Sequence, residues 1–163
     1  MTISVRRIKP DDVDLLRHVR LAALQDTPSA FAKTYEEESV YPHRLWAARA
    51  EDNSEGPDHT TIFAFDGDAC VGLVGGHRSA DGELVELVSM WTEPAARGRG
   101  VAAALVEAVV EWAGEYPVEL WVTQGNDAAQ RLYERCGFAE TGDYAPLPSD
   151  PCKDELRMRR EPA

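Results

Sequence analysis

A turn rich in arginine and glycine stands between two apolar segments and constrains the fold more than any other feature of the chain. It comprises Arg97, Gly98, Arg99, Gly100, Val101 and Ala102, and it follows an apolar stretch that ends near Thr92. An amphipathic stretch starts at Val101. Glycine lets the backbone pass close to a ligand, and the first amides of a helix have no partner within it. The pattern predicts a strand, a turn and a helix whose N-terminus binds an anion, with a pyrophosphate-bearing cofactor as the first candidate.

Length and composition predict one domain over residues 1–163. The chain has 163 residues, of which 44% are hydrophobic, and this is enough for a substantial core. No apolar run approaches the roughly 18 residues of a membrane span. The first ten residues lack the apolar segment of a signal peptide. We therefore expect a soluble, cytoplasmic protein without a membrane partner.

The charge balance is strongly acidic. Twenty-nine acidic and seventeen basic side chains give a formal net charge of −12, which disfavours attraction to nucleic acid or to anionic lipid. We expect no nucleic-acid partner, and a small or cationic one instead. Arg97 and Arg99 form a local positive charge within this acidic sequence, at the position where an anionic cofactor would need one. Charge alone nevertheless favours two solvated surface arginines.

The cysteines and histidines form no metal-binding pattern. Cys70, Cys136 and Cys152 are widely spaced, without a Cys-x-x-Cys motif, and the four histidines show no ligand spacing. We therefore predict neither a bound metal nor a disulfide framework. A catalytic Cys–His pair has no local signature here, and buried or surface thiols are favoured.

Periodicity and turn signals predict strands and helices in a mixed order. Strands are expected over residues 3–8, 61–65, 69–77, 84–92 and 118–123, with a final hairpin formed by residues from 138 onward and by 155–159. Helices are expected over residues 12–25, 100–113 and 127–136, and a shorter helix begins with Pro42 as its first residue. Residues 31–38, 51–58 and 145–151 are expected to form loops. Three adjacent antiparallel strands are thus predicted before the glycine turn.

The glycine turn also resembles two loops of nucleotide-binding proteins. Gly98-x-Gly100-x-x-Ala103 fits the loose dinucleotide fingerprint. That fingerprint belongs in the first strand–helix unit of a parallel sheet, whereas several antiparallel strands are expected before this turn, and Glu119 starts its strand rather than ending it. A triphosphate loop would need Gly-Lys followed by Ser or Thr, which is absent. An ordinary helix entrance rich in small residues remains the structural alternative.

Two sequence blocks resemble the GCN5-related N-acetyltransferase (GNAT) superfamily. Arg97-x-x-Gly100-x-Ala102 matches the signature Q/R-x-x-G-x-G/A, and residues 90–97 resemble the strand and loop that lead into it. The second block, which resembles the helix N-x-x-A-x-x-L-Y-x-x-x-G-F of the family, contains Asn126, Ala129, Leu132, Tyr133, Gly137 and Phe138. The resemblance is strongest over residues 84–138. It implies an α/β fold with a mixed sheet of about seven strands, a splayed central pair and about four flanking helices.

The resemblance implies acetyl-coenzyme A as the cosubstrate and no requirement for a metal. Backbone amides of residues 98–103 would hold the pyrophosphate, and the pantetheine arm would pair with the backbone around residues 90–92 like an added strand. The coenzyme-binding residues that it implies are Met90, Trp91, Thr92, Arg97, Gly98, Arg99, Gly100, Val101, Ala102, Ala103, Asn126 and Tyr133. For Trp91, core packing is favoured over a substrate role, and Asn126 fits a helix cap as well as a coenzyme contact.

Two side chains are candidates for the proton transfers of N-acetylation. Tyr133 lies where the family places a phenol near the coenzyme sulfur, and it would act as the general acid. A buried tyrosine that packs against Ala129 is the competing interpretation. Glu86 interrupts an apolar run eleven positions before Arg97, the spacing at which histone-acetylating members carry a base glutamate, although a structural ion pair accounts for it equally well. The developing oxyanion would meet a backbone amide near Met90.

The implied reaction moves the acetyl group directly to a primary amine of a small molecule or peptide, without a covalent enzyme intermediate. The sequence does not identify this acceptor, whose wall is expected from residues 31–38 and from the final hairpin around Tyr144. An acyl-coenzyme A sensor without turnover stays open as an alternative, as does a less favoured dinucleotide-dependent oxidoreductase. A homodimer stays open too, because such enzymes commonly dimerise, although no exposed apolar stripe marks an interface.

Overall fold

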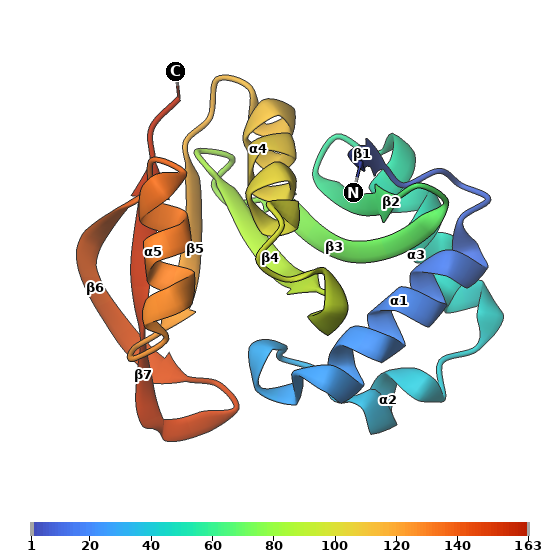
Figure 1. Ribbon diagram of the computed structural model, residues 1–163, viewed down its shortest axis with the longest axis horizontal. Helices are drawn as coiled ribbons and strands as arrows, with labels where there is room; N and C mark the ends of the chain where they lie inside the picture. Colours follow the sequence, from blue (N-terminus) through green and yellow to red (C-terminus); the bar gives the residue numbers. More distant parts are fainter. Residues whose placement is uncertain (1, 163) are drawn as a thin grey trace.

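One seven-stranded sheet runs through the molecule (Figure 1). The computed structural model describes residues 2–162. Its strands are β1 (Ile3–Arg7), β2 (His59–Asp66), β3 (Ala69–Arg78), β4 (Val85–Thr92), β5 (Val118–Thr123), β6 (Ala139–Leu147) and β7 (Asp150–Arg160), in the sheet order β1-β2-β3-β4-β5-β7-β6. Neighbouring strands are antiparallel except β4 and β5, which are parallel. The predicted mixed α/β fold with about seven strands is confirmed.

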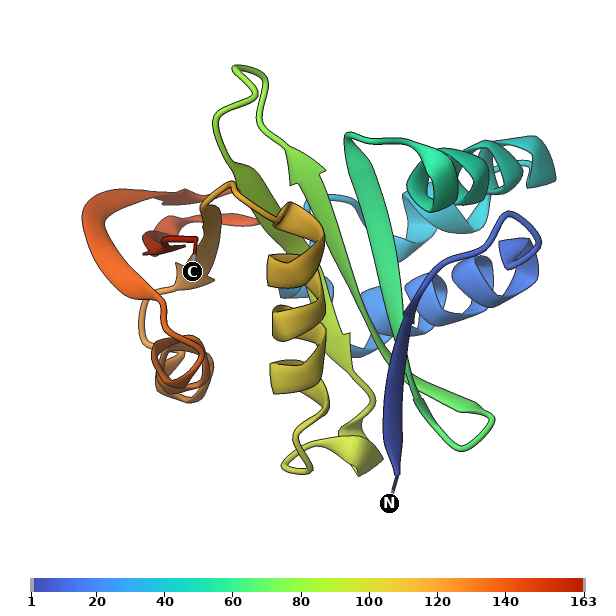
Figure 2. The same ribbon diagram turned by 90° about the horizontal axis from the view of Figure 1, so that it is seen from above.

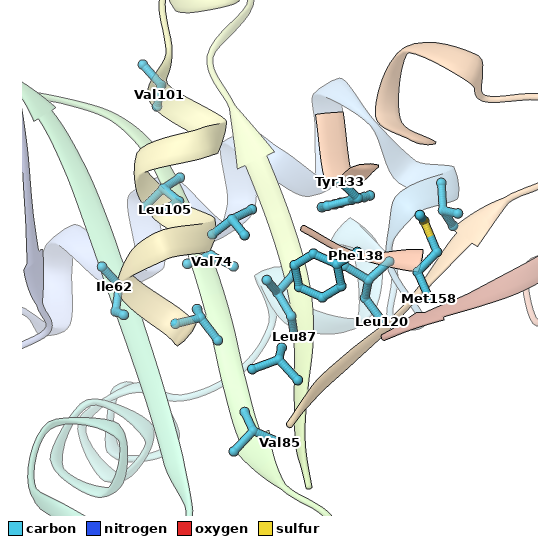
Figure 3. Close-up of a cluster of buried hydrophobic side chains, with 14 of the residues drawn as sticks. Ile62, Val74, Val85, Leu87, Val101, Leu105, Leu120, Tyr133, Phe138 and Met158 are labelled. Carbon is cyan, nitrogen blue, oxygen red and sulfur yellow. The ribbon is translucent and has the colours of Figure 1, made fainter. Parts of the chain in front are cut away.

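Helices cover both faces of the sheet (Figure 2). They are α1 (Val13–Asp26), α2 (Tyr35–Ser39), α3 (His43–Glu55), α4 (Val101–Ala113) and α5 (Asp127–Arg135), with short 3₁₀ turns η1 (Pro28–Ala30) and η2 (Pro94–Ala96). Apolar side chains of α4 and α5 share one buried cluster with Val74 and Leu120 of the sheet (Figure 3). Those of α1 and α3 share a second cluster with Phe63 and Leu73. The sheet therefore separates two cores.

β4 and β5 separate after two residue pairs, as the resemblance implied. Their register contains Val85 opposite Val118 and Glu86 opposite Glu119, and beyond these pairs the strands diverge (Figure 1). On the other side of β4, Val88 lies opposite Gly75 and Trp91 opposite Leu73. Residues 89 and 90 of β4 therefore face one residue of β3, which is a β-bulge, and a bulge bends its strand. The bend leaves one edge of β4 without a neighbouring strand.

Two helices in the N-terminal half differ from the prediction. The expected loop 31–38 contains the start of α2, and Thr34 Oγ1 accepts a hydrogen bond from the Glu37 amide at 3.1 Å. The Thr-x-x-Glu spacing of a capping box was the signal available for this helix. With α2, residues 2–162 contain five α-helices rather than about four.

α3 is longer than predicted at its C-terminus. It continues to Glu55, into the expected loop 51–58, because the helix-breaking pair Gly56-Pro57 comes only afterwards. Arg7 of β1 donates hydrogen bonds to the carbonyl oxygens of Asn53 and Gly56, which stabilises this end. At the other end Pro42 is the N-cap, with an extended ψ of 157°, and not the first helical residue.

The last hairpin has a shorter loop than predicted. β6 reaches Leu147 and β7 starts at Asp150, so that only two residues of the expected loop 145–151 connect them. Pro146 is tolerated within β6 because this strand lies at the sheet edge, where one side needs no partner. Apart from this hairpin and the C-terminus of α3, the predicted strands and helices end within two residues of their expected bounds.

Gly72 of β3 lies where α4 packs closely on the sheet, and this contact makes a prediction about stability. A Cβ at residue 72 would lie 2.8 Å from the Trp91 carbonyl oxygen and 3.2 Å from a side-chain carbon of Leu105. Because a backbone oxygen cannot move without disturbing the pairing of β3 with β4, Gly72→Ala should lower the free energy of unfolding by about 1–3 kcal/mol. Denaturant unfolding measures this loss. Gly75→Ala is the control, since its nearest contact is a side-chain methyl of the exposed Val88 at 3.2 Å and not a backbone atom. Equal losses in both variants would contradict the prediction.

Candidate functional site

The predicted anion-binding turn forms the entrance to α4. Gly98 and Gly100 have φ angles of 78° and 85°, a left-handed conformation that glycine adopts easily. Residues 98–100 are exposed, and a Cβ at either glycine would meet no atom within 4 Å. α4 then begins at Val101 without a side-chain cap, so the amides of residues 101–103 have no partner within the helix. The turn can therefore bind a pyrophosphate through main-chain amides.

The Arg97 side chain connects this turn to α1 by a hydrogen-bonded ion pair. Its Nη2 donates to Asp26 Oδ2 at 2.6 Å, and its Nε donates to the Thr92 carbonyl at 3.0 Å. Trp91 Nε1 donates to the same Asp26 oxygen at 2.9 Å. The hydrogen bonds from Trp91, Thr27 and Arg97 lower the pKa of Asp26 below its ordinary value, and that from Trp91 is the largest cause. One carboxylate thus joins the end of α1 to both β4 and the turn.

Residues 90–92 form the part of β4 that has a free edge. Trp91 is 8% exposed and belongs to the core beneath α1, which confirms core packing for this side chain. Met90 packs partly against the core on the opposite face. The register joins Trp91 and Thr92 to β3, whereas the β4–β5 register ends at Glu86. The free backbone edge can accept an extended ligand in the manner of an added strand.

Tyr133 projects from α5 into the core between β4 and β5 (Figure 3). Asn126 caps this helix, because its Oδ1 accepts a hydrogen bond from the Ala129 amide at 3.3 Å. The Tyr133 ring is 7% exposed and meets Phe138 edge to face, with centroids 5.9 Å apart. Burial raises the pKa of Tyr133 to about 12, and Cys136 adds a smaller contribution. The phenol therefore keeps its proton throughout the neutral range, as a general acid must.

Glu86 lies at the closed end of the splay, within a row of ionisable side chains. The strand register places His77, Glu86, Glu119 and Arg159 opposite one another on β3, β4, β5 and β7. Oε1 of Glu86 is 3.0 Å from Nη2 of Arg157, and Oε2 is 3.6 Å from Nε2 of His77. Arg157 also pairs with Glu119. Glu86 is therefore partly exposed and ion-paired rather than isolated in the core.

His77 is a neighbour of Glu86 that sequence reasoning missed. The signal was present, because the predicted turn Asp81-Gly82 centres the hairpin so that residue 77 lies opposite residue 86. By contrast, the contact of Arg157 with Glu86 joins residues 71 positions apart. It depends on how β5 and β7 are placed in the sheet, and no local pattern indicates it.

A cavity of about 580 Å³ lies on the face of the sheet that carries α1 and α3. Its floor includes His77 of β3 together with Val88 and Ser89 of β4, so it extends from the neighbour of Glu86 to the bulge. Arg20 and Arg49 contribute to its walls from α1 and α3. Lys33 and Glu38 also line the cavity, and they belong to the segment 31–38 that was expected to form an acceptor wall. Tyr144, which was expected there too, is exposed on β6 and does not line this cavity.

Glu38 is a completely buried acid at the edge of this cavity. It accepts two hydrogen bonds from Arg20 and one from Arg49. Burial alone would raise the pKa of the Glu38 carboxyl, but its hydrogen bonds and ion pairs with Arg20 and Arg49 more than offset this, and the pKa lies below its ordinary value. The carboxylate is therefore charged at neutral pH. The three members of this network come from separate helices, and sequence reasoning missed it.

The remaining reactive side chains form no further centre. Within residues 2–162, no three His, Cys, Asp or Glu side chains gather in a group that could hold a metal ion. Over the same residues no helix has the length and apolar character needed to cross a membrane. The cysteines are unpaired thiols, and burial raises the pKa of Cys70 to about 11, which makes it a weak nucleophile.

Comparison with known sequences identifies the family of this chain. Residues 21–138 match the Acetyltransferase (GNAT) family. A stretch of 61 residues is 39% identical to an uncharacterised N-acetyltransferase of Methanocaldococcus jannaschii, and it covers 36% of this chain and 27% of that relative. The chain thus spans about a quarter of the length of the curated relative that it matches.

Solved structures share the whole fold at low sequence identity. A Salmonella typhimurium protein with its cofactor acetyl-coenzyme A superposes with a TM-score of 0.77 at 18% identity, covering 100% of this chain and 95% of that chain. The spermidine N-acetyltransferase of Vibrio cholerae, in complex with coenzyme A and spermine, superposes with a TM-score of 0.73 at 18% identity, covering 98% and 95%. These likenesses concern the fold, whereas the family match extends over most of the sequence. This chain belongs to the acetyltransferase (GNAT) family.

Proposed function

We propose that this protein is an N-acetyltransferase, which transfers the acetyl group of acetyl-coenzyme A to a primary amine by direct attack. Family membership carries the proposal. Two features of the site support it, namely the uncapped N-terminus of α4 and the free edge of β4 beyond its two pairs with β5. The first suits the pyrophosphate of the coenzyme and the second suits its pantetheine arm.

In this proposal the coenzyme is held mainly by backbone groups. The amides of residues 98–103 bind the pyrophosphate, with exposed Arg99 beside them, and the backbone of residues 90–92 pairs with the pantetheine. Arg97 contributes through its backbone, since Asp26 and Thr92 engage its side chain. Asn126 uses Oδ1 to cap α5, which leaves its Nδ2 for the coenzyme.

The chemistry requires one proton donor, one proton acceptor and a group that stabilises negative charge. The amine nitrogen attacks the thioester carbonyl, and the C–S bond breaks. Tyr133 donates its phenolic proton to the departing sulfur, while a backbone amide near Met90 donates a hydrogen bond to the developing oxyanion. Glu86 receives the ammonium proton, directly or through water, with His77 beside it. The nitrogen loses its second proton to solvent as the tetrahedral intermediate collapses. Tyr133 then regains a proton from solvent, and Glu86 releases the proton that it accepted.

The acceptor approaches through the cavity of about 580 Å³ beneath α1 and α3. This cavity suits the role because it includes Ser89 at the bulge and His77 next to Glu86. Its size fits a small amine or the end of a peptide. The net charge of −12 favours the encounter with a cationic acceptor. The Vibrio cholerae neighbour, a spermidine N-acetyltransferase, acts on an acceptor of this kind.

A new carboxylate in the first turn of α4 would separate coenzyme binding from stability. Ala102 lies in this turn and is partly exposed. A negative charge there interacts favourably with the helix dipole, so Ala102→Glu should keep or slightly raise the melting temperature. The same charge repels a bound pyrophosphate and should weaken acetyl-coenzyme A about 10-fold or more. Calorimetric titration measures the affinity, Ala102→Gln is the uncharged control, and equal affinities for the two variants would argue against this site.

Thiol release tests the reaction itself. Acetyl-coenzyme A should raise the melting temperature, and a panel of primary amines should include at least one that releases free coenzyme A thiol. Binding without turnover would favour the acyl-coenzyme A sensor. Stabilisation by a nicotinamide or flavin cofactor, and not by acetyl-coenzyme A, would favour the oxidoreductase and refute the proposal.

Tyr133→Phe tests the general acid while keeping the ring that packs on Phe138. We expect kcat to fall about 100-fold, with the affinity for acetyl-coenzyme A unchanged.

The pH dependence of the wild type gives a second test of Tyr133. Because the pKa of Tyr133 is about 12, the wild-type kcat should show no loss from ionisation of Tyr133 below about pH 10. The raised pKa also means that the stability linked to this proton is complete below about pH 10 and is lost as the pH rises toward 12. A wild-type kcat in Tyr133→Phe would exclude Tyr133 as the general acid.

A further inference from the structure

Ser89 holds a backbone conformation that its side chain disfavours. Its φ of 59° is the one positive value among the non-glycine residues that the structure describes. In this region the Cβ approaches the next carbonyl oxygen, so glycine is the usual occupant. Ser89 also lies at the bulge where β4 turns away from β5. A contact from outside the strand is therefore needed to favour this conformation.

Arg20 of α1 supplies that contact. Its Nη1 donates a hydrogen bond to Ser89 Oγ at 2.8 Å. The Arg20 side chain is 12% exposed, and its guanidinium lies 4.7 Å from the centroid of the Phe31 ring. The hydrogen bond links a helix on one face of the sheet to the strained residue of β4. It joins positions 69 apart in the sequence.

Glu38 sets the direction of the Arg20 guanidinium. Nε of Arg20 donates to Oε1 at 3.1 Å and Nη2 donates to Oε2 at 2.9 Å. Two parallel hydrogen bonds between planar groups fix orientation as well as distance. Arg49 Nη1 donates a third hydrogen bond to this carboxylate at 3.1 Å. The guanidinium is therefore held in the one plane that leaves Nη1 facing Ser89.

Stability alone does not account for this arrangement. Glu38 is completely buried, and buried ion pairs contribute little net stability compared with apolar side chains of similar volume. Buried ion pairs instead fix the positions of their members, because breaking or moving one partner leaves an uncompensated charge. Such a pair suits a role in which a neighbouring group must be held in one place.

We propose that Arg20 and Glu38 are positioning residues, which hold the Ser89 bulge, and with it the backbone of Met90, in the geometry that acetyl transfer requires. The kinetic part of this inference rests on the proposed function, in which an amide near Met90 meets the oxyanion. Both residues act through Ser89. A small displacement of that amide lowers the rate, because hydrogen bonds to a transition state depend on position.

A double-mutant cycle tests the coupling of Arg20 to Ser89. Arg20→Gln and Ser89→Ala each remove one side of the same hydrogen bond, and each should lower kcat about 10-fold or more, with a smaller change in the KM for acetyl-coenzyme A. The double variant should be no slower than the slower single variant, because both changes break one contact. Losses that multiply in the double variant would overturn the proposal.

Arg6→Gln is the matched control. Arg6 also forms two hydrogen bonds with one carboxylate, that of Asp12, at 2.6 and 3.1 Å, but this pair is more exposed and does not contact the bulge. Breaking either pair should lower the melting temperature, and the fall should be larger in Arg20→Gln because it removes the main partner of the completely buried Glu38. With kcat measured well below both melting temperatures, we expect it to fall only in Arg20→Gln. A comparable loss of kcat in Arg6→Gln would attribute the effect to general destabilisation and overturn the proposal.

Backbone chemical shifts of Ser89 and Met90 report their conformation without any turnover. They should move toward extended values in Arg20→Gln and stay unchanged in Arg6→Gln. If Arg20→Gln does not fold, the Met90 shifts in Ser89→Ala provide the same measurement. Unchanged shifts in a folded Arg20→Gln would overturn the proposal. If the shifts move but the wild type acetylates no amine, the positioning role is supported and the proposed function fails instead.

Discussion

The separation of two parallel strands is the constraint on which the rest of this structure depends. β4 and β5 share two residue pairs and then diverge, so the backbone groups along one edge of β4 gain no sheet partner. Unpaired backbone groups are costly when buried, and an open edge is stable only in contact with water or with a ligand that replaces the missing strand. The bulge at Ser89 produces this edge, and contacts from α1 and α2 hold the bulge. The fold and the proposed binding of the coenzyme thus depend on the same strand.

The elements around this edge are tied together by a few carboxylates. Asp26 joins the end of α1 to Trp91 and Arg97, which places the turn before α4 next to the end of β4. Glu38 of α2 orients Arg20 of α1, which in turn contacts the bulge at Ser89. Each carboxylate accepts several hydrogen bonds from charged or ring N–H groups, which orient more strongly than neutral pairs do. The free edge of β4 is therefore supported by side-chain contacts from α1 and α2.

The proton-transfer candidates lie in contrasting surroundings. Tyr133 is buried among apolar side chains, and burial keeps its phenol protonated. Glu86 lies in a row of ionisable side chains with Arg157 and His77, where its carboxylate has polar neighbours on both sides. A buried acid that keeps its proton and a partly exposed carboxylate are suited to opposite roles in one reaction. The alternation along β4 separates these environments. Val85 and Leu87 face the core that contains Tyr133, and Glu86 between them faces the other side of the sheet, beside His77.

Local chemistry determined what the sequence could predict. Gly98, Gly100 and the periodicity of the following helix indicate an anion-binding turn, because glycine conformation and helix entry depend on adjacent residues. Most strand and helix bounds were predictable for the same reason, except those of α2, the end of α3 and the last hairpin. The register that pairs His77 with Glu86 was accessible from one turn. Only the tertiary structure decided that Arg157 binds Glu86 and that Glu38 and Arg20 hold Ser89. These contacts join residues far apart in the chain, and they form only when the packing of α1 and the order of the strands bring their side chains together.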